Sequence, residues 1–161
     1  MKIKFLLILA FILTDAVAFA QNNNAILTFE EAKELADQGD ARAQAITSMF
    51  YRIGWQTDKN EMLAEEYVTK SVNAGHPLGA YYFGKYLVEG INGKKDESRG
   101  HQIQKESFEP LRLIAADNSK PDPVAVTAIG EMLMEGKACA QDKRKGIDCF
   151  KWAAQHHYIP A

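Results

Sequence analysis

The chain has 161 residues, of which 25% are charged, and a formal net charge of −2. A mildly acidic chain without a basic cluster does not have the composition of a nucleic-acid-binding protein, so we expect no nucleic acid among its partners. Nothing after residue 20 is apolar over the roughly 20 residues that a membrane-spanning helix needs. The part from residue 29 to residue 161 suits a single domain.

The first 20 residues have the pattern of a secretory signal peptide. Lys2 and Lys4 precede an apolar run over residues 5–13, and Ala18 and Ala20 form a small-residue cleavage site. This order is typical of exported bacterial proteins, and the run is shorter than the roughly 20 residues of a bilayer span. We therefore expect cleavage after Ala20 and a mature protein in the periplasm.

The mature chain is predicted to begin with a flexible polar lead-in over residues 21–28. Thr28 is the expected N-cap of a first helix over residues 29–38, because Glu31 three positions on completes a capping box. Gly39 suits the end of that helix, where a left-handed backbone conformation is common.

An interval of fifteen residues then occurs three times. It separates Gly39 from Gly54, Gly75 from Gly90, and Pro121 from Gly136. An internal repeat predicts units that stack on their neighbours to bury a shared apolar face. We expect a short helix in each unit, over residues 41–53, 77–89 and 123–135.

Within these helices, small and large residues fall in fixed columns. The small columns are Ala43, Gly79 and Ala125, and Ser48, Gly84 and Gly130. The large columns are Thr47, Phe83 and Ile129, and Tyr51, Leu87 and Leu133. Small residues allow close approach of helices and large ones fill the space between them, so polar Thr47 departs from its column.

A second helix is expected after each short one. Apolar residues recur at helical spacing over residues 63–72 and again over residues 146–154. The middle repeat is longer, because the interval between marker glycines grows from 36 to 46 residues. We place the extra residues in a charged insert over residues 91–108, and we expect a kink at Pro110 or a helix that begins near it.

Two sets of residues together carry a known motif. The first half of the unit is represented by Ala43, Gln44, Ser48, Tyr51 and Gly54. The second half is matched in part by Asp58, Ala64, Tyr67, Lys70, Ala74, Gly75 and His76, and by Asp142, Lys145, Gly146, Phe150, Ala153, Ala154, Gln155 and His156. Over about residues 30–157 the chain resembles the Sel1-like repeat family, which is related to the tetratricopeptide repeat.

The resemblance implies an all-α solenoid of helical hairpins that acts as a binding scaffold, without a shared catalytic motif or a cofactor. We expect a monomer. Some exported, cysteine-rich members bind penicillins, but this chain has a single pair of cysteines at a different spacing. Some periplasmic members are immunity proteins against toxins of competing bacteria.

In solenoids of this type the first helix of each repeat lines the concave face. The positions expected there are Arg42, Met49, Arg52, Tyr81, Tyr82, Lys85, Thr127 and Glu131. Tyrosine and arginine are enriched at binding hot spots, so these residues are the predicted protein-binding site. Tyr81, Tyr82 and Tyr86 can equally pack between helices, and the sequence leaves that question open.

Cys139 and Cys149 are the only two cysteines. In an oxidising compartment an even number suggests a disulfide, which is our prediction. Two free thiols are one alternative. A zinc site with His156 or His157 is another, although structural zinc favours cysteine pairs two to four residues apart, so we predict no metal.

The sequence therefore predicts a non-catalytic scaffold that binds a protein or peptide in its concave groove. An immunity protein or inhibitor with one cognate toxin or enzyme is an alternative within the same class. A second alternative is an enzyme that acts on the cell wall or on a β-lactam. It is disfavoured because no nucleophile elbow, phosphate-binding loop or metalloprotease motif is present in the sequence.

Overall fold

The computed structural model describes residues 26–117, 120–156 and 158. The expected signal peptide and most of the lead-in lie outside these residues. Within them the chain forms seven α-helices and a short 3-10 helix, and no strand. The α-helices are α2 (Phe29–Asp37), α3 (Ala41–Ile53), α4 (Glu61–Asn73), α5 (Pro77–Glu89), α6 (Glu97–Ala115), α7 (Pro123–Glu135) and α8 (Lys143–Gln155), and the 3-10 helix is η1 (Ile91–Gly93).

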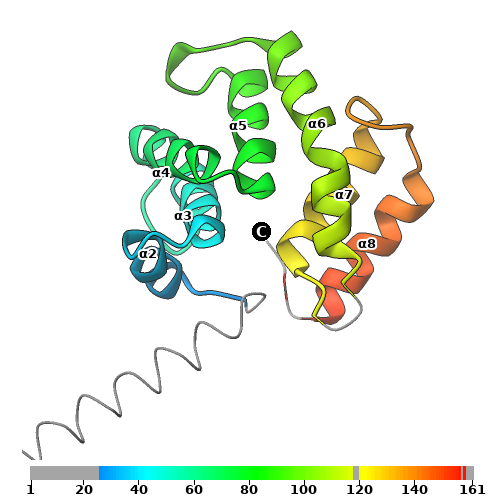
Figure 1. The fold of residues 1–161 in the computed structure, drawn as a ribbon, viewed down its shortest axis with the longest axis horizontal. Coiled ribbons are helices and arrows are strands. Elements are labelled where there is room, and N and C mark those ends of the chain that lie inside the picture. Colours follow the sequence, from blue (N-terminus) through cyan, green and yellow to red (C-terminus); the bar gives the residue numbers. More distant parts are fainter. Residues whose placement is uncertain (1–25, 118–119, 157, 159–161) are drawn as a thin grey trace, which may run out of the picture.

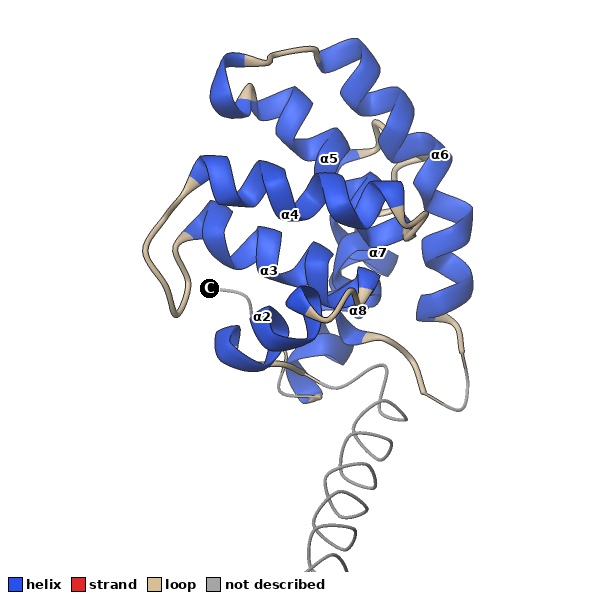
Figure 2. Ribbon diagram, turned by 60° about the vertical axis from the view of Figure 1, so that its left-hand side comes forward, coloured by secondary structure: helices blue, strands red, loops and turns tan. Residues whose placement is uncertain are grey.

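The helices form three hairpins, in which α3 pairs with α4, α5 with α6, and α7 with α8. Successive hairpins contact each other through α4 with α5 and through α6 with α7. Figures 1 and 2 show the hairpins following one another in an arc, with α2 packed on α3 at one end. The predicted all-α solenoid is confirmed.

The helix ends follow the side chains that the sequence places there. Thr28 caps α2 and forms a capping box with Glu31, as predicted. Gly54, Gly90 and Gly136 end the three short helices with φ angles of +72°, +78° and +70°. Glycine adopts this left-handed conformation without a steric penalty, which explains why the predicted bounds of these three helices are confirmed.

Small residues set the distance between the two helices of a hairpin. A Cβ atom on Gly100 would lie 2.6 Å from the carbonyl oxygen of Gly84, and one on Gly146 would lie 3.0 Å from that of Gly130. Each pair joins positions sixteen residues apart. Within the second hairpin, and likewise within the third, the backbones of the two helices are therefore in direct contact at this point.

The extra residues of the middle repeat lie at a different place from the predicted insert at 91–108. Helices α4 and α8 have 13 residues each, whereas α6 has 19. Because Gly100 stands at the register position of Ala64 and Gly146, α6 begins in step with the other two helices. The additional residues follow residue 109, and Pro110 lies inside α6 rather than at its start.

The predicted insert at residues 91–108 was wrong for a physical reason. The buried face of α6 consists of Gly100, Gln104, Ser107 and Leu111. Three of these four residues are small or polar, so the apolar stripe that marks an amphipathic helix is missing from the sequence. A charged segment without such a stripe suggests an insert, although its backbone packs like that of α4 and α8.

A buried ion pair joins the first hairpin to the third. The Arg42 Nε atom lies 2.7 Å from Asp122 Oδ2, and the Arg42 Nη2 atom lies 3.0 Å from Asp122 Oδ1. Asp122 is fully buried and also accepts hydrogen bonds from the backbone N–H groups at the start of α7. Contact between hairpins that are not neighbours shows that the arc is tightly curved.

Candidate functional site

The predicted concave site is largely inaccessible. Its residues come from α3, α5 and α7, as expected, but five of the eight are buried: Arg42, Met49, Tyr81, Tyr82 and Thr127. The reason is the tight curvature, which brings these helices against one another and against Tyr158. The concave face of the described structure is therefore a packed interior rather than an open groove.

The three tyrosines of α5 pack between helices, which answers the question that the sequence left open. The Tyr81 hydroxyl donates to Glu131 at 2.5 Å, and the Tyr86 hydroxyl donates to the carbonyl oxygen of Ser48 at 2.9 Å. Burial is the main cause that raises the pKa of Tyr81 and Tyr82 well above the ordinary value. Their hydroxyls connect the first helices of neighbouring repeats.

Three of the predicted residues remain half-exposed at the edge of this face. Arg52 pairs with Glu89 at 2.8 Å, between α3 and α5. Lys85 pairs with Glu131 at 2.5 Å, between α5 and α7. These charges hold neighbouring repeats together, so they are already engaged within the chain.

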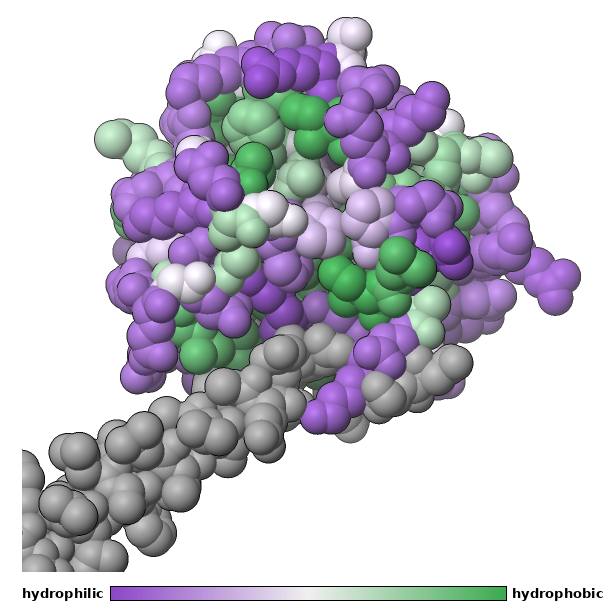
Figure 3. Space-filling view, in the orientation of Figure 1, coloured by the Kyte–Doolittle hydropathy of each residue, from purple (hydrophilic) through white to green (hydrophobic). Residues whose placement is uncertain are grey.

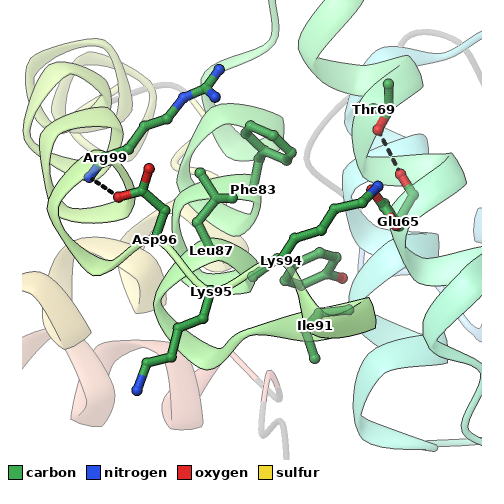
Figure 4. Close-up of a pocket in the computed structure, with 10 residues that line it drawn as sticks. Glu65, Thr69, Phe83, Leu87, Ile91, Lys94, Lys95, Asp96 and Arg99 are labelled. Carbon is green, nitrogen blue, oxygen red and sulfur yellow. Dashed lines mark hydrogen bonds and ion pairs between the residues drawn. The ribbon is translucent and has the colours of Figure 1, made fainter.

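A cleft of about 410 Å³ lies between α4 and α6. Figure 4 shows Phe83, Leu87 and Ile91 beside it, and Lys94 extending across it toward Glu65. Lys94 and Glu65 form an ion pair, and the Asn92 side-chain amide donates to Glu65 at 2.7 Å. One end of this cleft is therefore bridged by the chain itself.

A larger groove of about 610 Å³ lies between α6 and α8, above α7. Both outer helices pack on α7 but have little contact with each other. The floor consists of Val126, Ile129 and Leu133, and the walls include Phe108, Arg112 and Ala115 of α6 and Lys145, Cys149 and Trp152 of α8. We call this the α6/α8 groove.

The α6/α8 groove is elongated along its helices. Each of the three helices lines it with residues at the i, i+3, i+4 and i+7 spacings of one helical face. The stripe on α6 spans residues 108–115, which at about 1.5 Å per residue is roughly 10 Å long. The groove is therefore about as long as two turns of a helix.

The α6 wall of the α6/α8 groove is formed largely by the extra residues that make the middle repeat longer than the other two. Arg112, Ala115, Asp117 and Pro121 all line the groove and all lie after residue 109. The sequence prediction missed this site because it placed the extra residues elsewhere. The sequence does contain an indication of this site, because the interval from Gly90 to Gly136 is longer than that from Gly54 to Gly90. A repeat that is longer than its neighbours is expected to have a different surface.

The remaining surface is mixed. Figure 3 shows hydrophobic patches within a mainly hydrophilic face. Leu113 on α6 is 66% exposed and does not line the α6/α8 groove. Trp152, by contrast, is partly buried at the groove wall and stacks on His156 with a ring separation of 3.9 Å.

The predicted disulfide is not formed in the structure. Cys139 and Cys149 are both free thiols. Burial raises the pKa of each thiol above its ordinary value, which disfavours the reactive thiolate. Among the described residues no three histidine, cysteine or acidic side chains are grouped as metal ligands.

Among the helices of the described residues, none combines the length and the hydropathy that a membrane-spanning segment requires.

No family model matches the sequence, and no curated protein matches it significantly. Solved structures that resemble the chain include a Sel1 repeat protein from Oxalobacter formigenes, with 18% identity and a TM-score of 0.45 over 80% of this chain and 44% of that one. Another is a protective antigen of uropathogenic Escherichia coli strains displaying an SLR fold, with 22% identity and a TM-score of 0.44 over 81% of this chain and 26% of that one. The likeness is one of fold, and this chain spans less than half the length of either.

Proposed function

We propose that this protein is a non-catalytic scaffold that binds a protein partner in the α6/α8 groove. The observation that carries the proposal is the open groove of about 610 Å³ with an apolar floor on α7. Exposed apolar surface rimmed by polar residues marks protein-interaction sites and ligand-binding grooves. The predicted concave residues instead pack against one another and against Tyr158, as in the contacts of Tyr81 with Glu131 and of Tyr158 with Met49.

The occupant that fits the groove is an amphipathic helix of the partner. The groove is bordered by single faces of three helices and is roughly two turns long, which is the arrangement of helix-in-groove recognition. Trp152 and Phe108 offer aromatic contacts in the walls. Arg112 and Lys145 bring cations to the edge of the groove and Asp117 and Asp148 bring carboxylates, so polar residues of either charge on such a helix have a counterpart there. Arg112 and Lys145 are paired with Glu109 and Asp142 in the free chain.

The proposal includes export to the periplasm, which rests on the leader pattern of residues 1–20. The protein isolated from its host is expected to begin at Gln21 when its N-terminus is determined by mass spectrometry. A chain that retains Met1 or the apolar run over residues 5–13 would contradict this part of the proposal.

The binding proposal is tested by affinity capture with matched variants. The tagged chain from residue 21 to residue 161 is used against extract of the host, beside Trp152→Ala and Leu113→Ala. Both changes remove an apolar side chain from the outer layer, but only Trp152 lines the groove. Circular dichroism first establishes that both variants keep their helical content.

A partner of the groove is expected to bind the Trp152→Ala variant at least about tenfold more weakly, because a hot-spot residue contributes about 2 kcal/mol or more. Its capture by Leu113→Ala should be unchanged. Equal loss with both variants, or no loss with either, would show that the α6/α8 groove is not the binding surface.

A further inference from the structure

The cleft between α4 and α6, which we call the α4/α6 cleft, occupies the same place in the middle repeat as the α6/α8 groove does in the last one. Its floor includes Phe83 and Leu87 of α5. The residues at the same repeat positions in α7 are Ile129 and Leu133, and both are in the floor of the α6/α8 groove. The two sites are therefore versions of one groove, and the differences between them indicate what each can bind.

The α4/α6 cleft is smaller than its counterpart, at about 410 Å³ against about 610 Å³, and the chain crosses one of its ends. There Lys94 pairs with Glu65, and the Asn92 side-chain amide donates to the carbonyl oxygen of Glu61 at 3.1 Å. A helix laid along the cleft would meet this bridge. A volume of this size lies within the roughly 300–1,000 Å³ of small-molecule sites, so the occupant that fits is a small molecule.

The two sites also differ in the charges of the side chains that line them. The α6/α8 groove is lined by equal numbers of cations and carboxylates. The α4/α6 cleft is lined by three cations and two carboxylates, which are Lys94, Lys95, Arg99, Glu65 and Asp96. Its lining therefore favours a ligand with a negative charge.

Arg99 is the cation of the cleft that is available to a ligand. Lys94 pairs with Glu65, and Lys95 pairs with Glu97 at 2.7 Å. The backbone N–H of Arg99 donates to Asp96, the N-cap of α6, but its guanidinium has no hydrogen bond or ion pair within the part of the chain that the structure describes. Figure 4 shows the exposed Arg99 side chain on the wall opposite Glu65.

The residue at the same repeat position in α8 behaves differently. Lys145 also donates its backbone N–H to an N-cap, Asp142, at 3.0 Å. Its ammonium group, however, pairs with the same Asp142 at 3.1 Å. The free guanidinium is therefore a feature of the α4/α6 cleft and not of the repeat.

We propose that the α4/α6 cleft is a second binding site, separate from the α6/α8 groove, and that it takes a small organic anion with an apolar ring or branched body and one carboxylate or sulfonate group. The apolar body lies on Phe83 and Leu87. The anionic group accepts hydrogen bonds from the Arg99 guanidinium, whose planar arrangement of N–H groups matches two oxygen atoms of such an acid.

The test uses two fluorescent dyes with the same rings. Anilinonaphthalene sulfonate carries one negative charge, and phenylnaphthylamine lacks the sulfonate. Both dyes are titrated with the chain from residue 21 to residue 161 and with its variants Arg99→Gln and Lys145→Gln. Each variant removes an exposed cation at the same repeat position and keeps the backbone hydrogen bond to the N-cap. Circular dichroism establishes that both variants are folded.

We expect Arg99→Gln to bind the sulfonate dye at least about threefold more weakly than the wild-type chain, and the neutral dye with unchanged affinity. Lys145→Gln should bind both dyes as the wild type does. The proposal is overturned if the wild-type chain shows no saturable binding of the sulfonate dye, or if Arg99→Gln binds it as tightly as the wild type. An equal loss in both variants, or an equal loss of both dyes in Arg99→Gln, would also overturn it, because Arg99 would then not recognise the anion.

Discussion

At the scale of single residues, most buried polar side chains among the described residues have a hydrogen-bond partner. Thr47 is an exception whose effect on stability can be tested. Thr47 stands where the other two repeats have an apolar residue, and the structure places it fully buried. Its hydroxyl has no hydrogen-bond partner among the described residues. Thr127, by contrast, is also buried, but its hydroxyl donates to the carbonyl oxygen of Pro123 at 2.9 Å.

Replacing Thr47 with valine is expected to raise the free energy of unfolding by about 1 kcal/mol, because a buried unpaired hydroxyl is removed at nearly constant shape. Thr127→Val is the matched control and is expected to leave the stability unchanged or lower it by up to about 1 kcal/mol, since it removes a satisfied hydroxyl. Urea denaturation measures both. A loss of stability in Thr47→Val would show that its hydroxyl is paired.

Because His76 is a partly buried helix cap, we predict that the free energy of unfolding depends on pH. It caps α5 through Nδ1, which accepts from the Leu78 backbone N–H at 3.3 Å. Burial, the largest cause, lowers the pKa of His76 below its ordinary value of 6.5. The unfolded chain therefore takes up a proton more readily than the folded chain, so the stability from neutral His76 is complete above about pH 6.5 and decreases as the pH falls below it.

Replacing His76 with asparagine, a good N-cap without a titrating group, should flatten the pH dependence of unfolding between about pH 7.5 and pH 5.5. His156→Asn changes an exposed histidine and serves as the control. Thermal or urea unfolding across this range is the measurement. If His76→Asn and the wild type have the same slope, His76 is not the group responsible.

At the scale of helices, how well the sequence predicts an element depends on the chemistry of its buried face. The bounds of α3, α5 and α7 were predictable because capping residues and left-handed glycines mark both ends. The first turns of α6 were not predictable, because their buried residues are Gly100, Gln104 and Ser107 and do not form an apolar stripe. Close backbone contact replaces hydrophobic contact there.

Gly100→Ala tests that close contact. The added Cβ would lie 2.6 Å from the Gly84 carbonyl oxygen, so α5 and α6 must move apart. We expect a loss of about 1–3 kcal/mol in the free energy of unfolding, despite the higher helix propensity of alanine. Ser98→Ala, at an exposed position on the same helix, is expected to change it by less than about 0.5 kcal/mol. Comparable effects of the two changes in urea denaturation would contradict the backbone contact.

At the scale of the whole molecule, function depends on curvature, which the repeat pattern does not specify. The pattern places Arg42 and Met49 on the concave face, but the arc closes until Arg42 reaches Asp122 and Tyr158 reaches Met49. Contacts between residues 80 and 109 positions apart leave no local signal in the sequence. The α6/α8 groove was missed for a related reason, because it forms only when the extra turns of α6 pack beside α7.

Site-specific photo-crosslinking in the host tests most directly whether the α6/α8 groove binds a protein partner. A benzophenone amino acid replaces Lys145, which is exposed at the edge of the α6/α8 groove, or Leu113, which is exposed outside it. We predict one predominant crosslinked partner from position 145 and none from position 113. The same partner from both positions, or a partner from position 113 alone, would contradict the proposal that this groove is the binding surface.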